Sequence, residues 1–233
     1  MQDNTIFIDR RFCGPPDSAN GGYICGRLAA FIDGPAGVRL MSPPPLETEM
    51  RVVRDPDGLK MLLGDECIAV ARPAVVDLEL PQPPSLAGAR AASKNYRGFN
   101  DHIYPTCFVC GTNRDERDGL RLFAGPNGSD QSVAATWVPD DSLAGADGSV
   151  ATEFVWAALD CPGAFSFNET AKGSILLGEL AARIDGTLRV DEEYIVTGWQ
   201  IEHDGRRHIT GTAIFDRQMN CMASARGIWF EVQ

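Results

Sequence analysis

The sequence is poor in three features that would each identify a class of protein. Its 233 residues contain no uninterrupted apolar run of about 18 residues, the length that a membrane-spanning helix needs. Histidine occurs only three times, and His102, His203 and His208 form no metal-ligand pattern such as H-E-x-x-H. This argues against a histidine-based metalloenzyme and a Ser-His-Asp hydrolase. Basic residues are also scarce, because 21 Lys and Arg stand against 32 Asp and Glu, and so acidic a surface would repel nucleic acid.

Residues 1–4 (MQDN) lack the basic segment and the apolar core of a secretory signal, so we expect no export. The seven cysteines are an odd number, which does not suit a framework of disulfides. Together these features predict a cytoplasmic protein with reduced thiols. Hydrophobic residues make up 44 % and charged residues 23 %, which excludes a mainly disordered chain. The length permits one large domain or two smaller ones.

A stretch rich in proline, alanine and glycine divides the sequence at residues 81–105. We interpret it as a linker, because prolines remove backbone donors and glycines are costly to order. The flanking parts, residues 1–80 and 106–233, share a six-residue pattern. It is CIAVAR at 67–72 and CMASAR at 221–226, so four of the six positions are identical. The pattern indicates an internal repeat.

The elements around this pattern also match in order. An Asp-Gly pair, typical of a tight turn between antiparallel strands, lies before each copy, at residues 57–58 and 204–205. A candidate helix precedes each hairpin, at residues 20–32 and 150–161. β-Branched and alternating segments predict strands at residues 48–53, 59–63, 194–201, 208–215 and 222–230. Each half is therefore expected to be one helix followed by an antiparallel meander.

One acidic residue stands out near the end of an apolar helix. Residues 150–161 (VATEFVWAALDC) are apolar in almost every direction, which is typical of a buried helix, and Pro162-Gly163 should kink or stop it. Asp160 lies in the last turn, where a carboxylate opposes the helix dipole and is costly to bury. Partial burial would raise its pKa toward that of a general base. The alternative is a structural aspartate bonded to backbone groups or to an arginine.

Two other segments carry candidate site residues. Glu153 lies two helical turns before Asp160 on the same face, although its place in the first turn, where the dipole favours acids, suits a structural role better. Residues 20–23 (NGGY) open the first helix, and N–H groups at a helix N-terminus stabilise a carbonyl oxygen or an oxyanion. Asn20 either caps this helix or points its amide at a ligand.

Cys107 and Cys110 form a C-x-x-C motif with several possible uses. A zinc site needs further ligands, and Cys161 and Cys221 are isolated, so a four-cysteine site would have to assemble from distant elements. A redox dithiol would need a thioredoxin-like βαβ context, which the pattern lacks. We therefore expect a structural turn in which Cys107 and Cys110 hold no metal.

Several short segments together resemble a known family. They are FCGPP at 12–16, NGGY at 20–23, PPPL at 43–46, CFVCG at 107–111, DGL at 118–120 and WAALDCPG at 156–163. These segments resemble both parts of acyl-CoA thioesterase-like double-hotdog proteins. The resemblance implies an α+β double hotdog, in which each of two tandem halves wraps a curled antiparallel β-sheet around a central α-helix.

In hotdog thioesterases a helix carboxylate acts as the nucleophile or as a base toward water, and backbone N–H groups at a helix N-terminus hold the thioester carbonyl. By this resemblance Asp160 corresponds to the carboxylate, and residues 20–22 correspond to the turn that holds the carbonyl. We therefore predict Asp160 and Asn20 as catalytic residues, and Gly21, Gly22, Tyr23 and Glu153 as substrate-binding residues. The implied reaction is hydrolysis of an acyl-CoA or another small thioester without a cofactor. Because Ala29 stands where a symmetric copy would place an acid, we expect one working site per chain.

Other functions remain open on the same fold. A non-catalytic acyl or acyl-CoA binding protein would bind the ligand without turnover. A hotdog hydratase would need an Asp/His pair near a helix start, whereas the histidines of this chain lie in the linker and at a strand hairpin. The family resemblance also implies a tendency to form a homo-oligomer, such as a dimer of double hotdogs.

Overall fold

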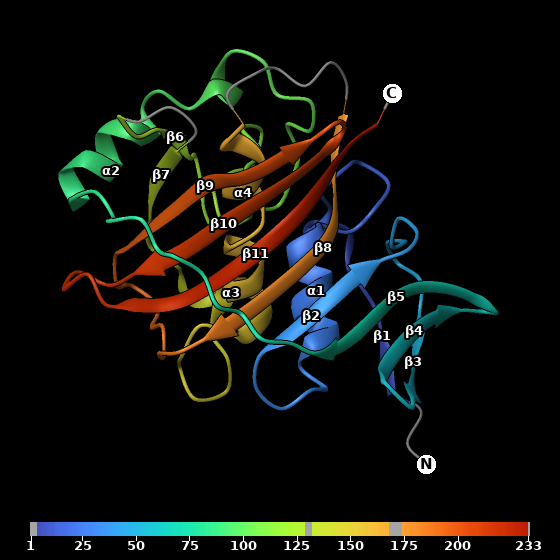
Figure 1. Ribbon diagram of the computed structural model, residues 1–233. Helices are drawn as coiled ribbons and strands as arrows, with labels where there is room; N and C mark the ends of the chain where they lie inside the picture. Colours follow the sequence, from blue (N-terminus) through green and yellow to red (C-terminus); the bar gives the residue numbers. More distant parts are fainter. Residues whose placement is uncertain (1–3, 129–131, 168–173, 233) are drawn as a thin grey trace.

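The computed structural model describes residues 4–128, 132–167 and 174–232. They form an eleven-stranded antiparallel sheet that curves around helices on one of its faces (Figure 1). In sheet order the strands are β1 (Asn4–Ile6), β3 (Met50–Asp55), β4 (Gly58–Leu63), β5 (Glu66–Pro73), β2 (Ala36–Leu40), β8 (Ser174–Ile184), β11 (Cys221–Val232), β10 (Arg207–Phe215), β9 (Tyr194–Asp204), β7 (Ser132–Trp137) and β6 (Gly125–Pro126).

Within the described ranges, four α-helices accompany the sheet: α1 (Gly21–Ala29), α2 (Leu86–Ser93), α3 (Thr152–Ala158) and α4 (Cys161–Phe165). Three single 3₁₀ turns lie at Arg10–Phe12, Arg97–Phe99 and Asp141–Leu143. In the part of the chain that the structure describes, no helix has the length and apolar character to cross a lipid bilayer.

Two sets of five strands repeat one order in this sheet. Numbered along the chain, each set lies in the order 1-3-4-5-2, which gives β1-β3-β4-β5-β2 and β7-β9-β10-β11-β8. In the chain, α1 falls between the first two strands of one set, and α3 and α4 fall between the first two strands of the other. β5 and β11, which carry the CIAVAR and CMASAR patterns, hold the same place in their sets. The sets meet where β2 pairs with β8 (Figure 1).

The strand signals of the sequence agree with this arrangement. Each predicted strand overlaps an observed one, and the two Asp-Gly pairs lie in the β3–β4 and β9–β10 hairpins. The predicted helix at residues 20–32 is shorter than expected, because α1 ends at Ala29. The local turn chemistry and the alternation of side chains were therefore sufficient to place these elements.

The predicted helix at residues 150–161 is broken into two. α3 ends at Ala158 and α4 begins at Cys161, with Asp160 between them at φ −84° and ψ −82°. Pro162 causes the break, since in a continuous helix its ring would clash with the carbonyl group of Ala158. The break frees the carbonyl oxygen of Leu159, which accepts a hydrogen bond of 2.7 Å from the Thr212 hydroxyl on β10.

The segment interpreted as a linker, residues 81–105, contains structure that the sequence analysis did not anticipate. Residues 86–93 form α2. Ser85 caps its N-terminus, because its hydroxyl accepts the Gly88 N–H at 3.2 Å. The buried face of α2 consists of Ala89 and Ala92, and the helix packs on β7. The small side chains of this segment let a helix lie close to the sheet.

α1 and α3 pack with their backbones close together. A methyl group on Gly26 of α1 would lie 2.7 Å from the Cα atom of Glu153 and 2.8 Å from Cβ of Trp156. At Gly22, an added Cβ would lie 2.5 Å from Cβ of Asp160 and 2.6 Å from the carbonyl oxygen of Trp156. Only glycine permits this approach, because a side chain would overlap backbone atoms that cannot rotate away.

This packing predicts that Gly26→Ala destabilises the fold even though alanine favours a helix by about 1 kcal/mol over glycine. The overlap with α3 should outweigh that gain and lower the free energy of unfolding by about 1–3 kcal/mol. Urea denaturation followed by circular dichroism measures the change. Gly145→Ala is the matched control, because a Cβ there meets its nearest neighbour at 3.6 Å and should change stability little. A Gly26→Ala variant as stable as the wild type would contradict the close packing.

Candidate active site

A cavity of about 680 Å³ lies where the start of α1, the α3–α4 junction and strands β8 and β11 come together. Its walls include the apolar side chains of Leu40, Ile175, Leu177, Trp229 and Phe230. This is the size and character of a small-molecule site, which is mostly apolar with a few convergent polar groups. Its polar lining includes Asn20, Asp160, Asp101, His102, Arg39, Arg97 and the three cysteines at 107, 110 and 161.

Asp160 is the buried acid of this cavity, with 2 % of its surface exposed. Its Oδ2 atom accepts the Gly22 N–H at 2.9 Å and the Asn20 Nδ2–H at 2.8 Å. Its Oδ1 atom has no hydrogen-bond partner among the described residues. Burial raises the pKa of Asp160 to about 7, although the Gly22 and Asn20 hydrogen bonds partly oppose the shift. A carboxyl group with such a pKa can exchange a proton near neutral pH.

Asn20 fills one of the two roles that the sequence left open, the helix cap, and its amide contacts another residue of the chain. Its Oδ1 atom accepts the Tyr23 N–H at 2.9 Å, which is the bond of a helix N-cap. Its Nδ2 atom donates to Asp160, 140 residues away in the sequence. One amide therefore caps α1 and orients the buried carboxylate. Beside it, Gly21 lines the cavity at the first position of α1.

The other predicted site residues lie in different surroundings. Gly22 reaches Asp160 through its N–H, as described above. Tyr23 is buried outside the cavity lining, where its ring stacks on Phe12 at 4.2 Å between centroids. Glu153 also lies outside the lining, in the first turn of α3 beside Gly26. The same-face argument that linked Glu153 to Asp160 assumed one continuous helix, and the break at residues 159–160 removes that assumption.

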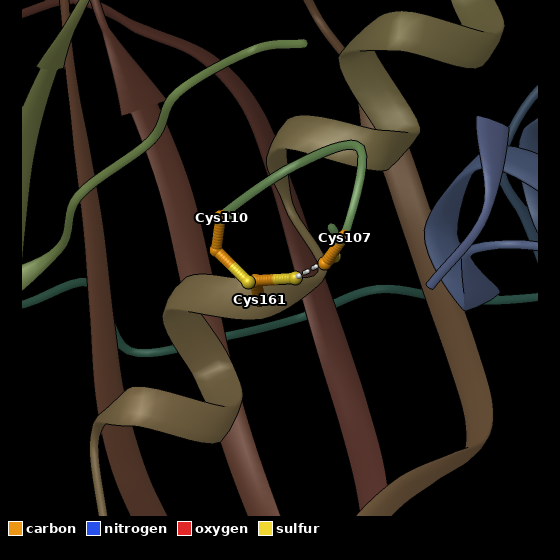
Figure 2. A group of neighbouring side chains, drawn as sticks. All are labelled: Cys107, Cys110 and Cys161. Carbon is orange, nitrogen blue, oxygen red and sulfur yellow. Dashed lines mark hydrogen bonds between the residues drawn. The ribbon is translucent and has the colours of Figure 1, made fainter. Parts of the chain in front are cut away.

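Several lining residues were not singled out for the site by the sequence. Cys161 lies directly after Asp160 and meets Cys107 and Cys110 (Figure 2). His102 receives or donates a hydrogen bond of 2.9 Å with the Tyr96 hydroxyl, and Arg97 donates to the carbonyl oxygen of Phe165 at 3.2 Å. The adjacency of Cys161 to Asp160 was a visible signal, whereas the positions of His102 and Arg97 depend on how residues 94–105 fold back.

Comparison with known proteins identifies the fold. No protein-family profile matches the sequence, and no curated protein matches it. Solved structures match over nearly the whole chain. The TesB protein of Mycobacterium avium subspecies paratuberculosis is 13 % identical, with a TM-score of 0.61, and the match covers 94 % of this chain and 90 % of that one. A hot dog fold protein of unknown function from Alicyclobacillus acidocaldarius is 10 % identical, with a TM-score of 0.61 and coverages of 98 % and 92 %.

A third structure, of a candidate thioesterase from Novosphingobium aromaticivorans, is 9 % identical with a TM-score of 0.61, and the match covers 98 % of this chain and 95 % of that one. Identities this low establish the fold alone. The chain has a hotdog fold, which confirms the architecture that the sequence resemblance implied at that level. The activity has to be argued from the site itself.

The Asn20–Asp160 hydrogen bond predicts how the stability of the protein changes when the amide and the carboxylate are exchanged. Asn20→Asp keeps a cap of similar strength but places a second carboxylate against Asp160, so the free energy of unfolding at neutral pH should fall by about 1–3 kcal/mol. Asn20→Ser, which caps without adding charge, should lose less. The double exchange, Asn20→Asp with Asp160→Asn, restores one amide–carboxylate hydrogen bond and should recover at least half of the loss. Chemical denaturation of the four proteins measures this, and no recovery in the double variant would argue against the contact.

Proposed function

We propose that this protein hydrolyses acyl-CoA or a related small thioester in the cytoplasm, with Asp160 as the base or nucleophile. The observation that carries the proposal is the setting of this carboxyl group. It is buried in a largely apolar cavity and held through Oδ2 by Asn20 and Gly22, while Oδ1 keeps no partner among the described residues. The hotdog fold, which this chain shares with a TesB protein, supports the same assignment.

The proposal includes a tandem arrangement of two hotdog halves. We assign residues 1–80 to the first half, residues 106–233 to the second and residues 81–105 to the connection between them. The repeated strand order supports this division, as does the position of one helix or helix pair after the first strand of each set. In this arrangement the start of α1 belongs to one half and Asp160 to the other, so the site lies at their interface.

The proposed reaction needs only water and groups of this chain. Asp160 takes a proton from a water molecule through Oδ1, and the water oxygen attacks the thioester carbonyl carbon. We assign the stabilisation of the developing oxyanion to the N–H of Gly21, a residue that lines the cavity at the start of α1. The C–S bond then breaks, and the thiol leaves with the proton that Asp160 held. The products are a carboxylic acid and a free thiol. In the nucleophilic variant, Oδ1 attacks first and water hydrolyses the resulting anhydride.

The walls of the cavity suit the two ends of such a substrate. Apolar side chains on β8 and β11, including Ile175, Leu177 and Phe230, offer a surface for an acyl chain. Arg39 and Arg97 also line the cavity, and guanidinium groups bind phosphate oxygens through paired hydrogen bonds. These two cations give an anionic carrier a local attraction in a protein whose net charge is −11.

Asp160→Asn tests the chemical role, because the amide keeps the shape of the side chain and cannot accept the proton. We expect kcat for the best thioester to fall by about 100-fold or more, as for other general bases, with substrate binding largely kept. An acyl-CoA panel with chromatographic detection of the released carboxylic acid measures turnover without interference from the seven cysteines. Asp185→Asn, at an exposed position on the surface, is the control and should match the wild type.

Two outcomes would contradict the proposal. If Asp160→Asn hydrolyses every active thioester at the wild-type rate, Asp160 has no part in the chemistry. If the wild type binds several acyl-CoAs by calorimetry and hydrolyses none, a non-catalytic acyl-CoA binding function replaces the hydrolase.

A further inference from the structure

Three cysteines from two distant segments converge at one wall of the cavity. Cys107 and Cys110 lie on the loop that follows residues 81–105, and Cys161 begins α4 (Figure 2). Their Sγ atoms all lie within 4.8 Å of one another. The three residues are 3 %, 4 % and 7 % exposed. Figure 2 shows the three side chains beside one another, with the one drawn interaction joining Cys107 and Cys161.

The separation of the Cys107 and Cys161 sulfur atoms matches metal coordination better than a disulfide. Cys107 Sγ and Cys161 Sγ are 3.8 Å apart. In a tetrahedral zinc site with Zn–S bonds of about 2.3 Å, two sulfurs are separated by about 3.8 Å, the edge of the tetrahedron. A disulfide would require about 2.05 Å. Free thiols gain little from such mutual proximity, since S–H is a weak donor and sulfur a weak acceptor.

The loop that carries two of the cysteines is closed by a tight turn. The Gly111 N–H donates to the Cys107 carbonyl oxygen at 2.9 Å, and a Cβ on Gly111 would lie 2.5 Å from the same oxygen. The tight turn therefore needs glycine at 111.

A side-chain donor faces the cluster. Asn20 Nδ2 lies 3.9 Å from both Cys107 Sγ and Cys161 Sγ, in addition to its shorter contact with Asp160. Amide groups that donate to ligating atoms are the usual second layer of a metal site, where they fix the orientation of the ligands. The nearby Oδ1 atom of Asp160, buried and without a hydrogen-bond partner among the described residues, is a further sign that this region is built for a ligand.

We propose that Cys107, Cys110 and Cys161 together bind a thiophilic divalent cation, Zn²⁺ foremost. Three thiolates are soft donors that select zinc over magnesium or calcium. Each thiol gives up its proton on binding, so the metal replaces one proton per cysteine. All three residues line the cavity, so water or an atom of a bound ligand can supply the fourth donor.

This inference goes beyond the proposed hydrolase and does not depend on turnover. It also departs from the prediction that Cys107 and Cys110 hold no metal. That prediction was made because the sequence offered no nearby further ligand. The third thiol is 54 residues from Cys107 and enters the site only through the fold. A bound metal would cross-link the loop at 107–110 to the start of α4, directly beside Asp160.

The metal content of the purified chain tests the proposal. Wild-type protein, expressed in zinc-supplemented medium and purified with a phosphine reductant and no chelator, should contain about one zinc per chain by mass spectrometry. Reconstitution with Co²⁺ should give thiolate-to-cobalt charge-transfer absorption together with the visible bands of tetrahedral cobalt. Zinc should also raise the midpoint of thermal unfolding of the metal-free chain, because it binds more tightly to the folded state, in which the three thiols lie together.

Matched variants locate the site. Cys161→Ser should retain at most about a tenth of the wild-type zinc, since even changes to residues behind the ligands weaken binding by about 10–100-fold. Cys67→Ser and Cys221→Ser are the controls, because these half-buried cysteines lie on β5 and β11 outside the cluster and should keep full metal content. If Cys161→Ser fails to fold, the cobalt spectrum of the wild type decides the question by itself.

Three results would overturn the proposal. The wild type could show neither zinc nor a cobalt charge-transfer band after reconstitution in the reduced state. Intact mass could instead reveal a disulfide between two of the three cysteines that persists in the presence of the reductant. Or Cys161→Ser could bind as much metal as the wild type. A chain that binds zinc but hydrolyses no thioester would leave the metal site established and remove only the hydrolase.

Discussion

The hydrogen bonds between the start of α1 and the Asp160 carboxylate are the contact on which the site depends. A carboxylate with 2 % exposure needs donors, since an unpaired buried charge is very costly. The donors are the Gly22 N–H and the Asn20 amide, and they reach Asp160 only because α1 and α3 pack at backbone distance. That distance in turn requires glycine at positions 22 and 26. The site is therefore a consequence of helix packing, and any change that separates the two helices leaves the carboxylate unpaired.

The break between α3 and α4 gives the cavity its second group of functional atoms. A continuous helix would carry successive side chains to directions about 100° apart, so Asp160 and Cys161 could not both line one wall. The unusual backbone of Asp160 at ψ −82° changes this, and both residues line the same cavity. The break leaves the carbonyl oxygen of Leu159 without a partner in the helix, and the Thr212 hydroxyl on β10 donates a hydrogen bond to it. One proline thus shapes the place where the carboxylate and the thiol cluster meet.

Local signals in the sequence were sufficient for some parts of this structure and not for others. The Asp-Gly hairpins could be predicted because turn chemistry is set by two or three adjacent residues. Asp160 could be singled out because an acid in an apolar helix is costly to bury unless it has hydrogen-bond partners. Glu153 could not be placed from helical spacing, since the spacing argument fails once the helix is interrupted. The cysteine cluster could not be found either, because the approach of Cys161 to Cys107 exists only after the sheet has curved around the helices.

The helix packing also explains why one site per chain is expected. Counted from the N-cap of each helix, Asn20 of α1 corresponds to Ala151 of α3, and Asp160 corresponds to Ala29. Ala151 makes no side-chain capping bond, so the second helix start has no amide to orient a carboxylate, and Ala29 supplies no carboxylate to orient. Alanine therefore stands in place of both the amide and the carboxylate at the equivalent pair of positions. Replacing only one of the two groups would have left the other polar group buried without its partner. The two alanines therefore keep the second position apolar and confine the charged contact, with its desolvation cost, to the cavity beside the cysteines.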